Sequence, residues 1–172
     1  MEEYEKFSFK DMDAVRKIIA KYPQGKQRSA VMPLLWLGQQ QNNNWISNAV
    51  LSHIAEVLHM NTAHVKEIAE FYSMFHSKKV GKYLVQICRT VVCALCQNQM
   101  IYKAIRDTIG IDVGETSEDE LFTVVEVECL GSCINAPVIM INDSYYEHLN
   151  YDKTVEILKE LQKKQQSHPS NV

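Results

Sequence analysis

The sequence predicts an α+β protein, in which a helical bundle is followed by a smaller layered domain with the order β-α-β-β-α. Apolar residues recur at helical spacing in the first half of the chain, whereas alternating and β-branched runs appear in the second half. The polar stretch 76–81, which ends in glycine, separates the two patterns. We therefore expect a helical domain over residues 1–80, a second domain over 81–165 and a disordered tail over 166–172.

Four helices are expected in the first domain. Ser29, Ser47 and either Asn61 or Thr62 are placed to cap the second, third and fourth helices. Each helix carries one apolar stripe, and the expected stripes are Val15, Ile18, Ile19 and Tyr22; Val31, Leu34 and Leu35; Val50, Ile54, Val57 and Leu58; and Val65, Ile68, Ala69 and Tyr72. Four short helices with short links are typical of a small bundle.

The second domain is expected to combine three strands with two helices. Runs of β-branched or alternating apolar residues predict strands at 82–87, 121–127 and 138–142. Apolar residues at helical spacing predict helices over 94–108 and around 155–161. A domain of this size has a modest core, so a bound metal centre would help to stabilise it.

Composition and charge exclude several classes of function. The 172 residues are 46% hydrophobic and 23% charged, which is ordinary for a globular protein. The net charge of −3 gives no basic field for binding nucleic acid. The first ten residues lack the apolar core of a signal peptide, and no apolar run is long enough to cross a bilayer. We therefore expect a cytoplasmic protein without direct membrane insertion, although such a chain can still belong to a membrane-bound assembly.

Five cysteines gather in the second domain, and none lies in the first. An odd number in a reducing compartment argues against a disulfide framework. Cys88 and Cys93 follow the first expected strand, and Cys129 and Cys133 follow the second. If these strands are parallel neighbours, both loops emerge at one end of the sheet. Four thiolates placed there can bind a 2Fe–2S cluster, in which each iron takes two of them.

Spacing alone leaves other interpretations of these cysteines open. Cys88, Cys93 and Cys96 reproduce the C-x4-C-x2-C spacing of plant-type ferredoxins, which would make Cys96 a ligand. Cys93 and Cys96 also form a C-x-x-C motif, which is typical of a thiol–disulfide oxidoreductase. A four-cysteine zinc site in an interaction module fits the gaps as well. Neither interpretation that uses Cys96 explains why Cys129 and Cys133 lie together.

Other chemistry has little support in the sequence. The six histidines are scattered, and none forms a ligand motif with a cysteine. No glycine-rich dinucleotide loop follows a strand, so this chain is not expected to bind a dinucleotide itself. The apolar group Phe71, Tyr72, Met74 and Phe75 either packs in the core or docks a partner. We see no nucleophile–base pair, so we expect neither a catalytic residue nor a substrate site in this chain.

The sequence resembles the E-subunit family of respiratory NADH:quinone oxidoreductase, complex I. The most specific match is ECLGSCINAP at residues 128–137. The similarity covers residues 10–162, and its other main matches lie at 22–41, 67–75, 88–93 and 114–149. It implies a thioredoxin-like ferredoxin domain behind the helical domain. Pro137 then falls where such folds commonly carry a cis proline.

The same resemblance implies a cofactor, a function and partners. The implied cofactor is one 2Fe–2S cluster, bound by Cys88, Cys93, Cys129 and Cys133, with Cys96 outside the ligand set. The implied function of the chain is to relay single electrons next to the flavin in the NADH-oxidising module of the complex. The expected partners are the flavin- and NADH-binding subunit and further peripheral-arm iron–sulfur subunits. Relatives of this family also serve NAD-linked hydrogenases and formate dehydrogenases, which leaves that setting open.

Overall fold

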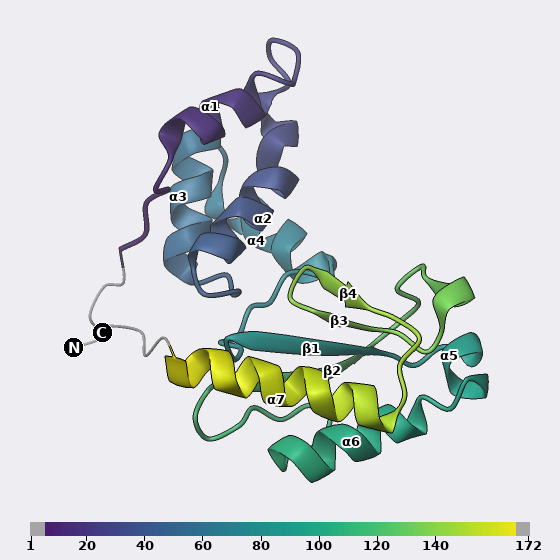
Figure 1. The fold of residues 1–172 in the computed structure, drawn as a ribbon. Coiled ribbons are helices and arrows are strands. Elements are labelled where there is room, and N and C mark those ends of the chain that lie inside the picture. The colour runs from purple at the N-terminus through teal and green to yellow at the C-terminus, as the bar shows by residue number, and fades with distance from the viewer. Residues whose placement is uncertain (1–5, 168–172) are drawn as a thin grey trace. The chain divides into compact units, whose positions relative to one another are not determined.

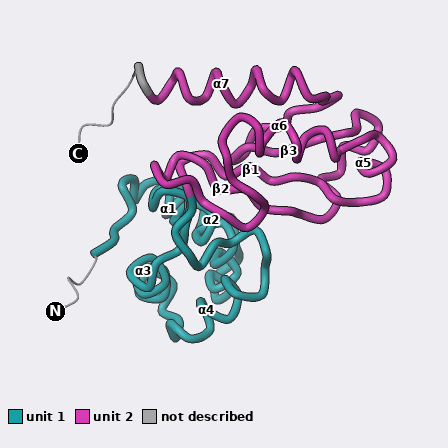
Figure 2. The backbone as a smooth tube through the Cα atoms, turned by 90° about the horizontal axis from the view of Figure 1, so that it is seen from below, with its two compact units in different colours: residues 1–80 teal, residues 81–172 magenta. Residues whose placement is uncertain are grey.

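The computed structural model describes residues 6–167, and these form two compact units that divide between Val80 and Gly81. Figure 2 shows the two units in different colours. The first unit is helical, and the second contains a β-sheet with helices packed on it (Figure 1).

The helical unit contains the four expected helices. They are α1 (Met12–Ile19), α2 (Val31–Gln41), α3 (Asn48–Leu58) and α4 (Thr62–Phe71), with a 3-10 turn, η1 (Gln27–Ala30), before α2. The expected bundle is confirmed, because the apolar stripes of these helices face one another. Their fully buried side chains include Val15, Leu34, Leu35, Val50, Ile54 and Val65.

Two of the expected helix caps are present, and one is not. The Ser47 hydroxyl accepts a hydrogen bond from the amide three residues on at 3.4 Å, and the Asn61 side chain accepts one from the amide two residues on at 2.9 Å. Ser29, which was expected to cap α2, lies inside η1 instead. The prediction is wrong because η1 runs directly into α2, so that Ala30 takes the cap position without a side-chain hydrogen bond.

One buried side chain ties the segment after α4 to α2. The Gln39 amide group donates to the Met74 carbonyl oxygen at 3.0 Å, and its Oε1 accepts from the His76 amide at 2.8 Å. These bonds fold the chain back on the bundle. The apolar group at the end of α4 is divided, with Phe75 in the core and Phe71 exposed.

The second unit is built on a four-stranded sheet with the strand order β2-β1-β3-β4 (Figure 1). The strands are β1 (Tyr83–Cys88), β2 (Phe122–Val127), β3 (Ile139–Ile141) and β4 (Ser144–Tyr146). β1 and β2 are parallel neighbours, which is the condition under which both cysteine loops leave one end of the sheet. β3 is antiparallel to β1, and β4 is antiparallel to β3. The sequence did not predict β4, because this strand is three residues long and lacks a buried face.

The helices of this unit differ from the prediction at one point. Instead of one helix over 94–108, α5 (Val91–Leu95) and α6 (Gln99–Ile109) are separated by a break at Gln97, whose φ is 63°. α6 and α7 (Tyr151–Ser167) lie side by side and share a core with the strands. That core includes Val85, Ile87, Ile101, Ile105, Phe122, Ile139 and Leu158.

The last helix, α7, has a side-chain cap at its start. The Asn150 side chain accepts a hydrogen bond from the Lys153 amide at 2.9 Å, as expected of a cap. The backbone of α7 continues to Ser167, so it includes the first two positions of the expected tail. Residues 168–172 of that tail lie outside the described residues, as do residues 1–5.

Gly81 begins the second unit where the backbone passes too close to β2 for a side chain. A Cβ atom at this position would lie 2.7 Å from the carbonyl carbon of Phe122. The Gly81 amide also donates to Thr123 Oγ1 at 2.6 Å, which fixes its position. Since the backbone would have to shift, we expect Gly81→Ala to lower the free energy of unfolding by roughly 1–3 kcal/mol.

The matched control is Gly38→Ala in α2. Its added Cβ would also meet an atom at 2.7 Å, but that atom is a side-chain methyl of Val50 rather than backbone. Alanine also favours helix over glycine by about 1 kcal/mol. Urea unfolding followed by circular dichroism should therefore show a smaller loss for Gly38→Ala, and equal losses would contradict the explanation.

Candidate metal centre

Four of the five cysteines lie in two loops at one end of the sheet. Cys88 ends β1 and Cys93 lies in α5, whereas Cys129 follows β2 and Cys133 begins the 3-10 turn η2 (Cys133–Asn135). Because β1 and β2 are parallel neighbours, both loops leave the sheet at the same end, where Figure 1 shows α5. The structure thus brings two pairs of thiols together.

Cys88 and Cys93 form the inner pair, and each is only 1% exposed. Cys88 Sγ lies 3.2 Å from Thr90 Oγ1. The Asn98 side chain donates to the Cys88 carbonyl oxygen at 3.0 Å, and the Asn98 amide donates to the Cys93 carbonyl oxygen at 3.1 Å. This buried asparagine, which sequence reasoning missed, therefore fixes α5 against the end of β1.

Cys129 and Cys133 form the outer pair, and both are exposed. Their Sγ atoms lie 3.4 Å apart, close to the roughly 3.7 Å that separates two sulfur ligands at about 2.3 Å from a tetrahedral metal ion. The Gly131 amide donates to Cys129 Sγ at 3.4 Å. The backbone φ angle of Gly131 is 84°, which glycine adopts without strain. The two sulfur atoms and the distance between them fit a pair of thiolates bound to one iron.

Backbone amides from the outer loop reach the inner thiols. The Leu130 amide donates to the Cys88 thiol, and the Val138 amide donates to the Cys93 thiol. Burial acts to raise the pKa of Cys88, but hydrogen bonds from a hydroxyl, two amides and a thiol outweigh it and leave the pKa below its ordinary value. Burial, with the neighbouring thiols, raises the pKa of Cys93. A metal that binds this pair must therefore displace a proton from Cys93.

Cys96 lies in a different environment from Cys93. It is the C-cap residue of α5 and its side chain is exposed, whereas Cys93 is buried. The two thiols of the C-x-x-C motif therefore do not form an equivalent pair.

The expected cis proline is confirmed. The Ala136–Pro137 peptide bond is cis. Pro137 is buried between the outer cysteine loop and β3. Val138, the next residue, forms a small core with the two inner cysteines.

Among residues 6–167, no three His, Cys, Asp or Glu side chains gather closely enough to hold a single ion. The cysteines form two pairs instead. A two-iron cluster takes two thiolates on each iron, so two pairs are the arrangement that it requires.

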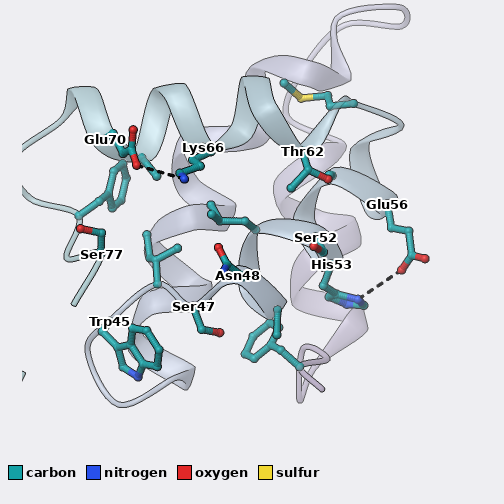
Figure 3. A pocket seen from close by; sticks show the side chains of 18 of the residues that line it. Trp45, Ser47, Asn48, Ser52, His53, Glu56, Thr62, Lys66, Glu70 and Ser77 are labelled. Atoms are coloured by element: carbon teal, nitrogen blue, oxygen red, sulfur yellow. Dashed lines mark ion pairs between the residues drawn. The ribbon is translucent and has the colours of Figure 1, made fainter. Parts of the chain in front are cut away.

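A large groove lies elsewhere, in the helical unit (Figure 3). Its volume is about 1870 Å³, and no cysteine lines it. Two ion pairs lie along it, His53–Glu56 at 3.9 Å and Lys66–Glu70 at 3.6 Å. The cysteines thus lie in the second unit and not in this groove.

The family of the chain follows from comparison with known proteins. A family model for the thioredoxin-like [2Fe-2S] ferredoxins matches residues 15–162. The chain belongs to this family. The E subunit of the NADH-quinone oxidoreductase of Rickettsia conorii is 44% identical over 156 residues, which cover 91% of this chain and 93% of that protein. The mitochondrial NADH dehydrogenase [ubiquinone] flavoprotein 2 of Dictyostelium discoideum is 42% identical, over 90% of this chain and 63% of that protein.

Solved structures support the fold of this ferredoxin. The crystal structure of an NAD+-reducing [NiFe]-hydrogenase in the air-oxidised state matches with a TM-score of 0.66 at 17% identity, over 76% of this chain and 23% of that chain. The sequence relatives are named as subunits of an oxidoreductase complex, so the expected resemblance to the E-subunit family is confirmed. Between residues 6 and 167, every helix is too short or too polar to cross a bilayer.

An ion pair joins the two cysteine loops of the ferredoxin. Arg89 directly follows Cys88, and Glu128 directly precedes Cys129. The Arg89 Nε and Nη2 atoms lie 3.0 and 2.9 Å from Glu128 Oε1, and Nη1 lies 3.9 Å from Glu126 Oε2. These side chains are largely exposed, so the pair contributes only about 0–1 kcal/mol to stability. Its main effect should be on the charge around the thiols.

We expect substitutions in this pair to shift the reduction potential of the iron–sulfur centre in opposite directions. Reduction adds negative charge, so Arg89→Gln should lower the potential and Glu128→Gln should raise it. The shifts should be on the order of 10–60 mV, since a tenfold change in a one-electron equilibrium corresponds to about 59 mV. Redox titration followed by electron paramagnetic resonance measures them.

Arg106→Gln is the control for these two variants. Arg106 also forms an exposed ion pair, with Asp112, but it lies near the end of α6 that is remote from the cysteine loops. We expect no shift for this variant. A shift in Arg106→Gln equal to that in Arg89→Gln would mean that net charge, and not the ion pair between the loops, determines the effect.

Proposed function

We propose that this chain is the small iron–sulfur subunit of the NADH-oxidising module of an NADH:quinone oxidoreductase. In this role it holds one 2Fe–2S cluster on Cys88, Cys93, Cys129 and Cys133 and relays single electrons. The observation that carries the proposal is the placement of two thiol pairs at the ends of two parallel strands. The 44% identity to a protein named as the E subunit of this enzyme supports the setting.

The residues of the chain supply ligands, hydrogen bonds and shielding from water. When bound, the cluster accepts and releases one electron at a time. Amide groups of Gly131, Leu130 and Val138 donate to the ligand sulfurs and offset their negative charge. The inner pair is buried and excludes water, while the outer pair stays at the surface, where a redox partner can approach.

The proposed partners are the flavin- and NADH-binding subunit and further iron–sulfur subunits of the peripheral arm. The relatives are named as subunits, which supports an assembly with other chains. We place the chain in the cytoplasmic, peripheral part of a membrane-bound complex. NADH and flavin bind the partner in this proposal, and no residue of this chain is assigned a catalytic role.

Two alternatives have less support. A thiol–disulfide oxidoreductase needs a reactive thiolate in its C-x-x-C motif, but Cys93 is buried with a raised pKa. The match to an NAD+-reducing hydrogenase at 17% identity supports the fold alone, and not membership in an NAD-linked hydrogenase or formate dehydrogenase. The sequence relatives at 42–44% identity favour the NADH:quinone oxidoreductase.

The metal content of the protein tests the proposal. Protein purified without oxygen should be brown and contain about two iron and two acid-labile sulfide per chain. A colourless protein that contains zinc would support the interaction module instead. A colourless, metal-free protein that reduces disulfides would support the thiol enzyme.

Single cysteine variants test the ligand set. We expect Cys129→Ser or Cys133→Ser to reduce the iron content from about two per chain to nearly none, because each iron needs two thiolates. The second unit should also unfold more easily without its metal. Iron analysis and the visible spectrum measure the first effect, and thermal unfolding measures the second.

Cys96→Ser is the matched control, because it makes the same substitution in an exposed cysteine outside the proposed set. Its iron content and visible spectrum should match those of the unmodified protein. Loss of the cluster in Cys96→Ser, together with its retention in Cys133→Ser, would support the plant-type ligand set and refute ours.

A further inference from the structure

Thr90 lies between the first cysteine and the helix that carries the second. It is the N-cap residue of α5, and its backbone is extended, with φ −72° and ψ 165°. A threonine in this position usually caps its helix, because the hydroxyl oxygen accepts a hydrogen bond from an amide two or three residues on. In α5, which lies wholly within the described residues, Thr90 does not form that bond. Its hydroxyl is therefore available for another contact.

The Thr90 hydroxyl contacts the sulfur atom of Cys88 instead. Thr90 Oγ1 lies 3.2 Å from Cys88 Sγ, which is a hydrogen-bonding distance for sulfur. Iron binds cysteine as a thiolate, whose sulfur has no proton to donate. When Cys88 is a ligand, the hydroxyl must therefore be the donor and the sulfur the acceptor.

The two cysteine loops differ in this hydrogen bond. In each loop, the amide two residues after the first cysteine donates to the sulfur of that cysteine, from Thr90 to Cys88 and from Gly131 to Cys129. The outer loop has glycine at this position, so it has no side chain that could add a second donor. The inner loop has threonine, and its hydroxyl supplies that second donor.

The surroundings of Cys88 make the hydroxyl bond effective. Cys88 is only 1% exposed, so water does not compete for its sulfur. A hydrogen bond to a charged acceptor is stronger than one to a neutral acceptor, and a buried site of low dielectric constant strengthens it further. Adding one electron to the iron–sulfur centre increases the negative charge on the ligand sulfurs. The bond should therefore stabilise the reduced state more than the oxidised state.

We propose that the Thr90 hydroxyl donates to the Cys88 sulfur and thereby raises the reduction potential of the iron–sulfur centre. This inference rests on the proposed function. The reaction is the gain of one electron from a redox partner, and the hydroxyl keeps its proton in both states. Thr90 acts through the ligand sulfur and does not bind iron, so it is a positioning residue whose role is separate from ligation.

The test compares two substitutions of Thr90 in the full-length protein purified with its cluster. Thr90→Val removes the hydroxyl but keeps the β-branched shape and the backbone amide. We expect it to lower the equilibrium constant for one-electron reduction by about tenfold, which corresponds to about 59 mV. Thr90→Ser keeps a hydroxyl and should retain the potential of the unmodified protein. Titration with dithionite, followed by electron paramagnetic resonance, measures the potentials.

Thr108→Val is the matched control. Thr108 is half-buried, as Thr90 is, but it lies near the end of α6 that is remote from the cysteine loops. The same substitution there should leave the potential unchanged.

Salt separates the effect of the hydroxyl from that of the neighbouring charge on Arg89. The ion pairs of Arg89 are largely exposed, so salt at about 1 M should screen them and reduce the shift caused by Arg89→Gln. The Thr90 hydroxyl directly contacts a buried sulfur, so the shift caused by Thr90→Val should persist in the same salt. A shift in Thr90→Val that disappears at high salt would contradict the inference.

The possible results also separate this inference from the proposed function. If the unmodified protein contains no 2Fe–2S cluster, the proposed function is wrong and the inference fails with it. If the cluster is present and Thr90→Val has an unchanged potential, only the inference is refuted. An equal decrease in Thr90→Ser and Thr90→Val would refute it too, because the hydroxyl would not be the cause. Loss of iron in Thr90→Val, with full iron content in Thr90→Ser, would also overturn it, since the hydroxyl would then serve to bind the cluster.

Discussion

The parallel pairing of β1 with β2 is the constraint on which the whole site depends. Its register places Cys88 opposite Val127, so the two cysteine loops begin at the same level of the sheet. Parallel strands need a long crossover connection, and α5 and α6 lie within it. Cys93 belongs to the start of that crossover. If the strands were antiparallel, the two loops would leave from opposite ends of the sheet and the four thiols could not meet.

The third strand explains how the outer loop reaches the inner pair. β3 runs antiparallel to β1, with Ile139 opposite Ile87, so it begins beside the end of β1. The chain that leaves β2 must therefore pass over the end of β1 before it enters β3. This path carries the Leu130 amide to Cys88 and the Val138 amide to Cys93. The hydrogen bonds to the inner thiols are thus a consequence of strand order.

The sequence predicted the features that depend on local pattern and missed those that depend on tertiary contact. Cysteine spacing and β-branched runs located both loops. The break at Gln97 was invisible because glutamine is a good helix former, and the surrounding apolar residues keep helical spacing. The contact between Arg89 and Glu128 joins residues 39 positions apart. Opposite charges beside the first cysteine of each pair were visible in the sequence, but only the strand register shows that they meet.

The two cysteine pairs are buried to different extents, and this difference meets two opposing requirements of an electron-transfer site. A metal centre is held and shielded best when water is excluded, whereas electron exchange needs a short path to a partner. The inner pair is 1% exposed and the outer pair is open to solvent, so each need is met by a different half of the site. If a cluster lies between them as we propose, the open half is where a redox partner can approach it. Because the surroundings of a metal site control its solvent access and redox potential, the partner would then help to set the potential of the cluster that it reduces.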